Sequence, residues 1–538
     1  MNNFNSFEKN IVDLNTKRSR FPMDHGHKTT FASGRLIPFD VVETMPGDTF
    51  SWDTFSLTRL LTPRFPTMDN AYLDLYAFFV PFRLCTKDEK DWPRITGENF
   101  DGPWVNSTEY TLANTGNLYS ITSCEAQSIL NYMGLGIAES YSSGSKSVNA
   151  MPLRGLFRIW NEFFRDQNTM SPIDLVDPFT EDIQPEEASQ FLPVSKYHDY
   201  FTSASLAPQK ANSGVPILFE GLAPVITTDS YSHGDTTGVP LRFVNIDGTD
   251  RSGTLATNTN GQTIITGSSV SSSTNRMEPV NLFADLSAST ISNINDLRFA
   301  FGLQSILERR TYGSRYRETI KNEFGINIPD GLVQVPQYLG GKHIPININQ
   351  VANTSSNVGQ TGAFSLTADS AHMFTKSFVE RGYIFIVGCV RTDNTYSYGC
   401  PKYLGAHKVR YYDFYHPLLA NLGDMPIYRD EIYSDSNIID VFGYNEAWAE
   451  YRFIPNKVTG MLAPNSPYAN TFMAWTYTEA FDESPVLAES FIKSNKDTLG
   501  QTLVDTSSPV QIIIDLEFKV TATRPMPLFS IPSLLGRW

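Results

Sequence analysis

An apolar and aromatic run at residues 72–80, within MDNAYLDLYAFFVPF, constrains the fold of this chain most strongly. Pro66 and Pro81 bound the run, which makes it short for a buried helix, and its Tyr and Phe residues favour a strand. We therefore predict a strand buried on both faces, which needs a second sheet or a layer of helices against each face. Asp74 is the one charge in the run and requires a partner if it is buried.

Further strand patterns lie towards both ends of the chain. Residues 36–43 and 49–61 flank a Pro-Gly-Asp turn sequence, which predicts a hairpin or a sheet corner. Residues 382–390 form a second apolar run, and residues 510–521 alternate apolar and polar side chains, as in an antiparallel strand with one face on the core. Because core strands come from both ends, we predict an antiparallel sandwich with the middle of the chain inserted between them.

Two segments have helical patterns. Pro152 opens the first, PLRGLFRIWNEFFRDQN, whose apolar side chains recur on one face. Residues 290–324 predict one or two helices, with Gly313 as a possible division and Gly325 as the stop. The stretch from there to about residue 370 is predicted to be a polar loop. Additional strand candidates are residues 408–415 and 447–454.

Composition limits the classes of function. The 538 residues carry 42 Lys and Arg against 57 Asp and Glu, a net charge of −15, so contact with nucleic acid is expected only at a local basic patch. Four cysteines without a C-x-x-C pair indicate a reduced compartment and thiols in the core. We find no apolar signal segment and no apolar run of about 18 residues, so we expect neither signal-directed secretion nor membrane insertion.

The middle of the chain changes composition at residues 209–288, where Gly, Ser, Thr and Asn are abundant. Short β-type runs at residues 241–246 and 263–266 stand near Asp-Gly and Asn-Gly pairs, which are strong hairpin signals. We predict an exposed β-rich insertion with long loops, where recognition commonly resides; a passive excursion is the alternative.

Two segments carry local positive charge. Residues 1–35 form a polar arm that includes Lys17, Arg18 and Arg20; it is either a poorly ordered terminus or an arm that lies on a neighbouring chain or on nucleic acid. The segment LERRTYGSRYRETIK interleaves Arg and Lys with Tyr, which suits nucleic acid. The same pattern is typical of a solvated helix face or of ion pairs between subunits.

Several long motifs occur in order along most of the chain: FASGRLIPFDVVETMPGDTF, TPRFPTMDNAYLDLYAFFVPFRL, KYHDYFTSASLAPQK, FADLSASTISNINDLRFAFGLQSILERRTYGSRYRE, VQVPQYLGGKHIPININQV, FTKSFVERGYIFIVGCVR, YYDFYHPLLANLGDMPIYRDEIY and DVFGYNEAWAEYRFIPNKVTG. They resemble the major capsid proteins of the Microviridae, and within that family the gokushoviruses. Residues 209–281 have no convincing counterpart, and in the family this place holds a variable insertion that builds a protrusion at the threefold axes.

The resemblance implies a mainly β fold, an eight-stranded antiparallel jelly roll with long helical and loop insertions and a β-rich protruding insertion. The corresponding division of the chain is an N-terminal arm at 1–35, the first jelly-roll strands with helical and loop excursions at 36–208, the variable insertion at 209–288, a helical insertion and loop at 289–370, the remaining strands at 371–523 and a tail at 524–538.

The same resemblance implies a structural role in a virion. Many copies would form a T=1 icosahedral shell around circular single-stranded DNA in the cytoplasm of a host bacterium. The implied partners are a small basic DNA-packaging protein, other virion proteins such as a pilot protein, and a host surface receptor.

Candidate residues follow for three kinds of contact. Because acidic subunits do not neutralise DNA globally, we assign nucleic-acid contact to Lys17, Arg18 and Arg20. The apolar, proline-rich tail predicts burial in an adjoining subunit or beneath its own shell domain, because a monomer gains little from leaving such residues in water. The tail candidates are Phe529, Leu534 and Trp538, and the host-attachment candidates within the insertion are Tyr231, Asp247, Asn258 and Asn260.

Two other classes of function are weighed against the capsid. A polysaccharide-acting enzyme would need a carboxylate pair, but Glu446 and Glu450 would lie about 13 Å apart along a strand, beyond the roughly 5–9.5 Å of glycosidases. A carbohydrate-binding adhesin module is the other alternative. We predict no catalytic, cofactor or metal site: Gly340-Gly341-Lys342-His343 lacks the other phosphate-loop residues, and His25 and His27 have no third ligand nearby.

Overall fold

The structure is a computed structural model that describes residues 18–87, 117–175, 192–210 and 439–529, most of 294–352 and 361–434, Trp92, and short strands between residues 219 and 291. The chain divides into two compact units. One unit combines Met1–Lys210 with Glu308–Trp538, and the other is Ala211–Leu307.

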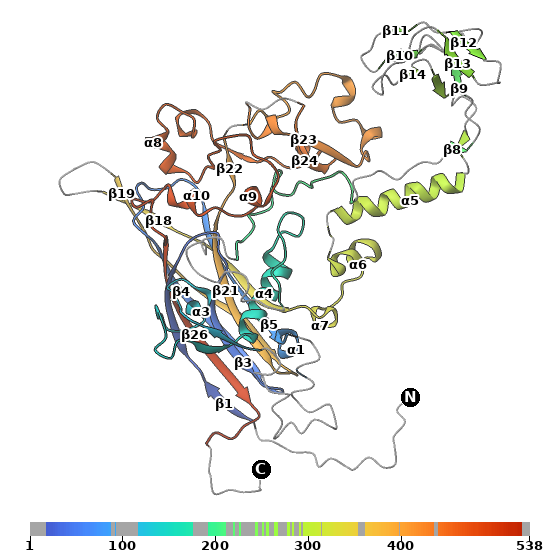
Figure 1. Ribbon diagram of the computed structural model, residues 1–538. Coiled ribbons are helices and arrows are strands. Elements are labelled where there is room, and N and C mark those ends of the chain that lie inside the picture. The colour runs from blue at the N-terminus through green and yellow to red at the C-terminus, as the bar shows by residue number, and fades with distance from the viewer. Residues whose placement is uncertain are drawn as a thin grey trace, which may run out of the picture. The chain divides into compact units, whose positions relative to one another are not determined.

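Two antiparallel sheets form the centre of the first unit (Figure 1). One has the order β1-β26-β4-β20, with β2 also paired to β26, and the other has the order β17-β5-β21-β3. The strands are β1 (Ser19–Pro22), β2 (His25–Phe31), β3 (Ile37–Thr44), β4 (Thr49–Leu60), β5 (Ala71–Pro81), β17 (Gln337–Pro345), β20 (Thr367–Ser377), β21 (Gly382–Thr392) and β26 (Ile512–Arg524). The predicted mainly β, antiparallel fold is confirmed.

Strand β5 is buried on both faces, as its sequence predicts. Leu73, Leu75 and Phe79 pack into the core between the two sheets, together with side chains of β4, β21 and β26. Phe78 and Val80 belong to a second core on the opposite face of the strand. The alternating side chains of one strand therefore serve two hydrophobic cores, which explains the unbroken apolar run.

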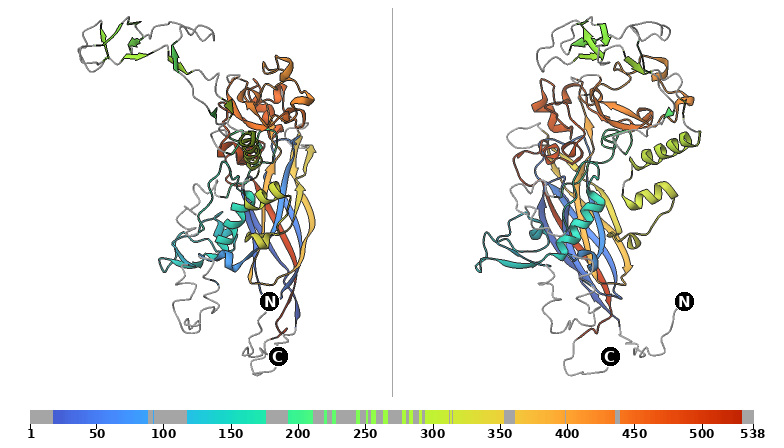
Figure 2. Two further views of the ribbon diagram at one scale, coloured as in Figure 1. Left: turned by 90° about the vertical axis from the view of Figure 1, so that its right-hand side faces the viewer. Right: turned by 45° about the vertical axis from the view of Figure 1, so that its right-hand side comes forward.

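Helix α4 (Met151–Ile159) supplies part of that second core, and a π-helical turn, η1 (Trp160–Phe164), continues it. Its buried side chains Leu153, Leu156 and Trp160 pack with Phe385 of β21. Figure 2 shows the helix lying along one face of the sandwich. Gly155 allows this close approach, because a Cβ there would lie 2.8 Å from the Phe385 ring. The helix predicted from Pro152 onwards is confirmed.

Strand β26 has the predicted alternation. Ile512, Ile514 and Leu516 are buried, whereas Ile513 between the first two is exposed. The strand pairs with β4 on one edge and with β1 and β2 on the other. Residues 19–31 belong to the predicted polar arm but contribute two strands to the sandwich. Their low apolar content gives no strand signal, because β1 and β2 form the edge of the sheet.

The Pro-Gly-Asp sequence turns the chain from one sheet to the other. Gly47 has a φ of 89°, which favours glycine, and the Asp48 amide donates to the carbonyl oxygen of Met45. Strand β3 pairs with β21, whereas β4 pairs with β20 and β26. Of the two predicted outcomes, a hairpin or a sheet corner, the structure therefore has the corner.

The stretch predicted as a polar loop after Gly325 instead contains strands β17, β18 (Ile348–Ala352), β19 (Thr361–Ser365) and the first part of β20. Gly340 interrupts the apolar pattern of β17 at a register shift against β5. A Cβ at this position would lie 2.1 Å from the Met373 carbonyl oxygen, so glycine is needed where β20 passes closely.

Residues 393–511 connect β21 to β26 and are termed the crown; they lie at one end of the sandwich (Figure 1). Its elements are β22 (Thr395–Tyr396), η2 (Tyr411–Asp413), η3 (Pro417–Leu419), β23 (Asp424–Tyr428), η4 (Arg429–Glu431), β24 (Val441–Glu446), η5 (Ala449–Tyr451), β25 (Asn456–Lys457), η6 (Gly460–Leu462), α8 (Ala469–Phe472), η7 (Met473–Trp475), α9 (Glu489–Ile492) and α10 (Lys496–Gly500). The strands predicted at 408–415 and 447–454 are wrong: both segments contain 3₁₀ turns, and Trp448 has a φ of 67° that interrupts extended backbone.

The second unit consists of short antiparallel pairs and the first part of α5. Its strands are β8 (Phe219–Glu220), β9 (Val225–Thr227), β10 (Phe243–Asn245), β11 (Asp250–Arg251), β12 (Thr254–Thr257), β13 (Thr263–Thr266), β14 (Met277–Pro279), β15 (Leu282–Ala284) and β16 (Thr290–Ile291). Strands β12 and β13 form a hairpin, and β10 pairs with β11 and β14. The strand segments predicted at 241–246 and 263–266 are present.

The remaining elements belong to the first unit, except for α5, which begins in the second unit. They are α1 (Phe82–Cys85), β6 (Leu118–Ile121), α3 (Ile129–Tyr132), β7 (Lys146–Asn149), α5 (Ile294–Thr311), α6 (Tyr316–Phe324) and α7 (Asp330–Val333). Two helices are therefore present within residues 290–324, as predicted, with Gly313 between them. Gly325 ends α6 with a φ of 71°.

Candidate assembly surfaces

The crown exposes a large set of apolar and aromatic side chains, termed the crown surface. Its members are Tyr403, Leu404, Val409, Tyr411, Tyr412, Phe414, Tyr415, Leu418, Leu422, Tyr451, Phe453 and Ile454. Leu418 and Ile454 are 89% and 88% exposed. A soluble monomer rarely leaves so much apolar area in water, so the crown surface indicates contact with another macromolecule.

Side-chain contacts help to hold the loops of this surface. The Lys408 ammonium lies 4.2 Å from the centre of the Tyr451 ring and 3.2 Å from a carboxylate oxygen of Glu450. The Trp448 indole donates to the carbonyl oxygen of Leu419 at 2.8 Å. These contacts fix the aromatic loops in place, which favours binding because little conformational entropy is then lost on association.

A buried charged cluster lies beneath the loops. Lys402 is 3.6 Å from Glu431 and 3.8 Å from Glu450, and all three side chains are largely buried. The Tyr200 hydroxyl donates to Glu431 at 2.9 Å. Burial raises the pKa of Glu431, while the nearby Lys402 charge opposes that shift.

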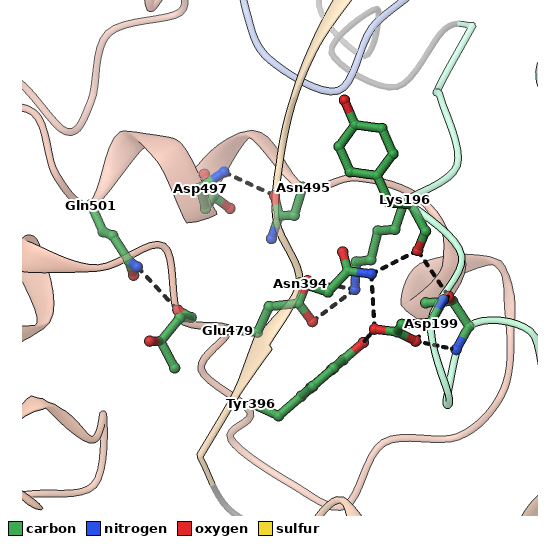
Figure 3. A network of polar contacts seen from close by, with 11 residues as sticks. Lys196, Asp199, Asn394, Tyr396, Glu479, Asn495, Asp497 and Gln501 are labelled. Atoms are coloured by element: carbon green, nitrogen blue, oxygen red, sulfur yellow. Dashed lines mark hydrogen bonds and ion pairs between the residues drawn. The ribbon is translucent and has the colours of Figure 1, made fainter. Parts of the chain in front are cut away.

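A second polar network joins the crown to residues 196–199 (Figure 3). Lys196 donates to Glu479 at 2.7 Å, and both side chains are at least 90% buried. Asn394 and Tyr396, at the end of β21 and in β22, both donate to Asp199, at 2.9 and 2.7 Å. The network connects residues 196–199 with two parts of the crown that are distant in sequence, residues 394–396 and Glu479.

Asp74, the charge inside β5, has the partners that its burial requires. Its carboxylate is 2% exposed and accepts from Arg391, from the Tyr197 hydroxyl at 2.8 Å and from His343. Arg391 comes from β21 and His343 from β17, so the cluster ties three adjacent strands of one sheet together. The requirement for a partner is confirmed.

The structure places two of the three residues predicted to contact nucleic acid. Arg18 and Arg20 are exposed at β1, where Ser19 pairs with Arg524 of β26. Arg20 donates to Thr521 at 3.4 Å, and Arg524 donates to the Glu43 carbonyl oxygen at 2.9 Å. Lys17 lies outside the described residues. The exposed arginines Arg18 and Arg20 thus lie at one end of the sandwich, whereas Arg524 of the adjacent strand is only 18% exposed and lies 3.4 Å from Asp48.

Three of the four arginines of LERRTYGSRYRETIK have partners within the chain, and Arg309 is exposed. Arg310 pairs with Glu323 at 2.7 Å, Arg317 pairs with Asp330, and Arg315 donates to the carbonyl oxygens of Asn161 and Arg165. These contacts account for three of the basic residues without nucleic acid.

The predicted tail contacts are partly described. Phe529 is 76% exposed, so among the described residues it is not covered by its own sandwich. Leu534 and Trp538 lie outside the described residues. So do all four attachment candidates, Tyr231, Asp247, Asn258 and Asn260.

The residues considered for enzymatic or metal chemistry have structural partners. Glu446 pairs with Arg452, and Glu450 pairs with Lys402 and Lys408. Gly340-Gly341-Lys342-His343 lies within strand β17 rather than in a phosphate loop.

The first two histidines are also engaged: His25 hydrogen-bonds Asp40 at 2.7 Å, and His27 hydrogen-bonds the Phe39 carbonyl oxygen. Within the described part of the chain there is no cluster of metal-binding side chains, and no helix there is long and apolar enough to cross a bilayer. All four cysteines are free, and burial raises the pKa of Cys85 and Cys389 to about 12.

A β-sandwich with a large exposed apolar surface is typical of a structural protein that associates with other macromolecules. Sequence reasoning did not find the crown surface, because it interpreted the Tyr-rich segment at 408–415 as a strand. The sequence did contain an indication of this surface. Residues 408–415 are aromatic, but no second segment was identified that would pair with them in a sheet, and this pattern is typical of a loop that makes contacts.

Comparisons with known proteins identify the family. Residues 10–534 match the family model described as "Capsid protein (F protein)". The chain is 34% identical to capsid protein VP1 of Chlamydia phage 1, with 96% of each chain covered. It is 33% identical to capsid protein VP1 of Bdellovibrio phage phiMH2K, over 98% of this chain and 97% of the relative. It is 30% identical to capsid protein VP1 of Spiroplasma virus 4, over 99% and 98%.

The chain therefore belongs to the F-protein family of capsid proteins, within the gokushovirus-type Microviridae. It is a structural major capsid protein of a bacteriophage virion. The resemblance found in the sequence motifs is confirmed.

Proposed function

We propose that copies of this chain assemble into a T=1 icosahedral shell around circular single-stranded DNA, with an eight-stranded jelly roll as the shell-forming unit. The crown surface carries this proposal, because a capsid subunit must bury apolar area against its neighbours and the crown offers a large, rigid area of that kind. Symmetric closure repeats the same contact many times, so individual contacts of modest strength suffice.

The arginines at the β1–β26 end supply a local site for DNA phosphates. Arg18 and Arg20 are exposed there, and Lys17 adjoins them in sequence. The acidic subunit has a net charge of −15, so a small basic packaging protein is expected to neutralise most of the genome. Other virion proteins, such as a pilot protein, complete the particle, which forms in the cytoplasm of the host bacterium.

The insertion at residues 209–288 is proposed to form a protrusion that attaches to a host surface receptor. Short strands joined by polar, Gly-rich connections support this role, because recognition commonly resides in loops presented by a scaffold. Tyr231, Asp247, Asn258 and Asn260 are the candidate contacts. The tail residues Phe529, Leu534 and Trp538 are proposed to contact an adjoining subunit.

Expression of the full chain followed by analytical ultracentrifugation and negative-stain imaging tests the proposal. We expect closed particles of uniform size with the mass of a T=1 shell. A preparation that stays monomeric at high concentration while hydrolysing a polysaccharide would contradict it and would favour the enzymatic alternative.

A further inference from the structure

A pocket of about 430 Å³ opens within the crown surface, between the segments 396–408 and 450–459. The apolar walls of the pocket include Tyr396, Leu404, Phe453 and Ile454. Leu404 and Ile454 are strongly exposed, so they form a rim around the opening rather than a closed core. The volume suits one or two inserted side chains and lies at the low end of the range for small-molecule sites.

Four of the five charged side chains that line the pocket compensate one another, and the fifth, Lys457, is exposed to solvent. Lys402 lies between Glu431 and Glu450, and Lys408 is 3.2 Å from Glu450. Two ammonium groups therefore face two carboxylates in one network. This balance favours a neutral occupant, because a charged group would have to compete with an existing ion pair.

One polar atom at the pocket has no partner. The Ser397 hydroxyl oxygen is buried and makes no hydrogen bond to another described residue, and Ser397 lines the pocket. A buried hydroxyl without a partner is unfavourable, and a bound group with a donor or acceptor would relieve this cost. The preferred occupant thus has an apolar body and one hydrogen-bonding group.

The pocket is preformed. Gly399 packs directly against η4, where a Cβ would lie 1.7 Å from the Glu431 carbonyl oxygen, and the Cys400 amide donates to the Asp430 carbonyl oxygen at 2.8 Å. On the other side, β22 pairs in parallel with β25, with Thr395 opposite Asn456. Both walls are therefore fixed by backbone contacts before anything binds.

We propose that this pocket receives a neutral side chain of a second copy of this chain and is the anchor point of the contact made by the crown surface. The inference rests on the proposed shell assembly. A second copy is favoured as the occupant because the apolar rim continues into the exposed crown surface, which a small molecule inside the pocket would leave in water. Preformed pockets that accept one side chain near the centre of an apolar area are typical anchors of protein interfaces.

A rim substitution tests the proposal in the full-length protein. Ile454→Asp places a charge on the rim at a side chain that is 88% exposed, so the subunit should fold and melt as the wild type does. The lowest protein concentration that yields particles in sedimentation should rise at least about tenfold, as expected when an interface anchor is lost. Val379→Asp is the matched control, because Val379 is also 88% exposed but does not line the pocket. It should change that concentration less than about threefold.

Two further measurements examine the occupant. Ser397→Ala removes the unpartnered hydroxyl and should raise the concentration needed for assembly about threefold or more. p-Cresol, a neutral ring with one hydroxyl, should compete with the second copy and inhibit wild-type assembly. Binding of p-cresol to the subunit with no effect on assembly would overturn the proposal and identify a small-molecule pocket instead.

The outcomes separate this inference from the proposed function. If the wild type forms no particles, shell assembly itself fails. If the wild type assembles and Ile454→Asp assembles equally well, or if Val379→Asp is impaired to the same degree, the pocket is not the anchor and only this inference is overturned. Should Ile454→Asp melt below the wild type, Leu404→Asp, at a side chain that is 71% exposed, takes its place with the same criteria.

Discussion

Replacement of Asp74 by Asn should strongly destabilise the sandwich. The substitution keeps the size of the side chain but removes the charge that compensates Arg391, whose guanidinium is 13% exposed and also donates to the Ser195 carbonyl oxygen. Loss of one partner from a buried ion pair typically costs about 3–5 kcal/mol, because the remaining charge stays buried without compensation. Domains are stable by only about 5–15 kcal/mol, so this is a large fraction of the total.

Urea unfolding of the unassembled subunit, followed by tryptophan fluorescence, measures this effect. Asp515→Asn is the control: Asp515 pairs with Lys28 at 3.1 Å, but both side chains are exposed, so the loss should stay within about 1 kcal/mol. With a slope of about 2–3 kcal/mol per molar urea, the Asp74 variant should unfold roughly 1–2 M earlier. A free energy of unfolding within 1 kcal/mol of the wild type would refute the structural role assigned to this cluster.

Three further predictions concern other parts of the chain. Leu516→Ala should lower the free energy of unfolding by about 2–5 kcal/mol, because Leu516 is fully buried, whereas Ile513→Ala on the exposed face of β26 should cost far less; chemical denaturation compares the two. The hydrogen bond to Asp40 raises the pKa of His25 from 6.5 to about 9, so its stabilisation is complete below pH 6.5 and is lost as pH rises through 9. His25→Gln should therefore destabilise the subunit more at pH 6 than at pH 10 in thermal melts. Deletion of residues 525–538 should leave the melting temperature of the subunit unchanged but reduce the yield of particles, and a normal yield would argue against a tail contact between subunits.

The long core strands were predictable because a strand buried on two faces, or one with strict alternation, leaves a clear pattern. Three predicted strands correspond to β5, β21 and β26 of the sandwich, at residues 72–80, 382–390 and 510–521. The predicted corner depended on Gly47, where the positive φ explains the turn sequence. In these regions local sequence and tertiary structure agree, so sequence reasoning succeeds.

Edge strands and the crown were not predictable in the same way. Strands β1 and β2 are polar and exist because β26 offers them an edge, and β17 is interrupted at Gly340 by the close passage of β20. The aromatic segment at 408–415 has strand-forming residues but forms no strand, and its aromatic side chains are exposed. Whether a polar segment pairs with a neighbouring strand, or an aromatic segment stays exposed, depends on the rest of the fold. The sequence of the segment alone does not show it.

The Asp74 and crown clusters were only partly predictable. The charge in the apolar run indicated that Asp74 needs a partner, but Arg391 and His343 are hundreds of residues away in the sequence, so only the fold identifies them. The same holds for Lys402 and Glu450, which meet through two separate loops.

A cryo-electron microscopy map of particles assembled from the full chain is the most direct test of the central claim that the crown surface joins copies of this capsid protein. We expect closed shells in which β4 and β26 lie in one sheet and the side chains around Ile454 are buried against a second copy. A map in which these side chains face solvent in every copy would contradict it.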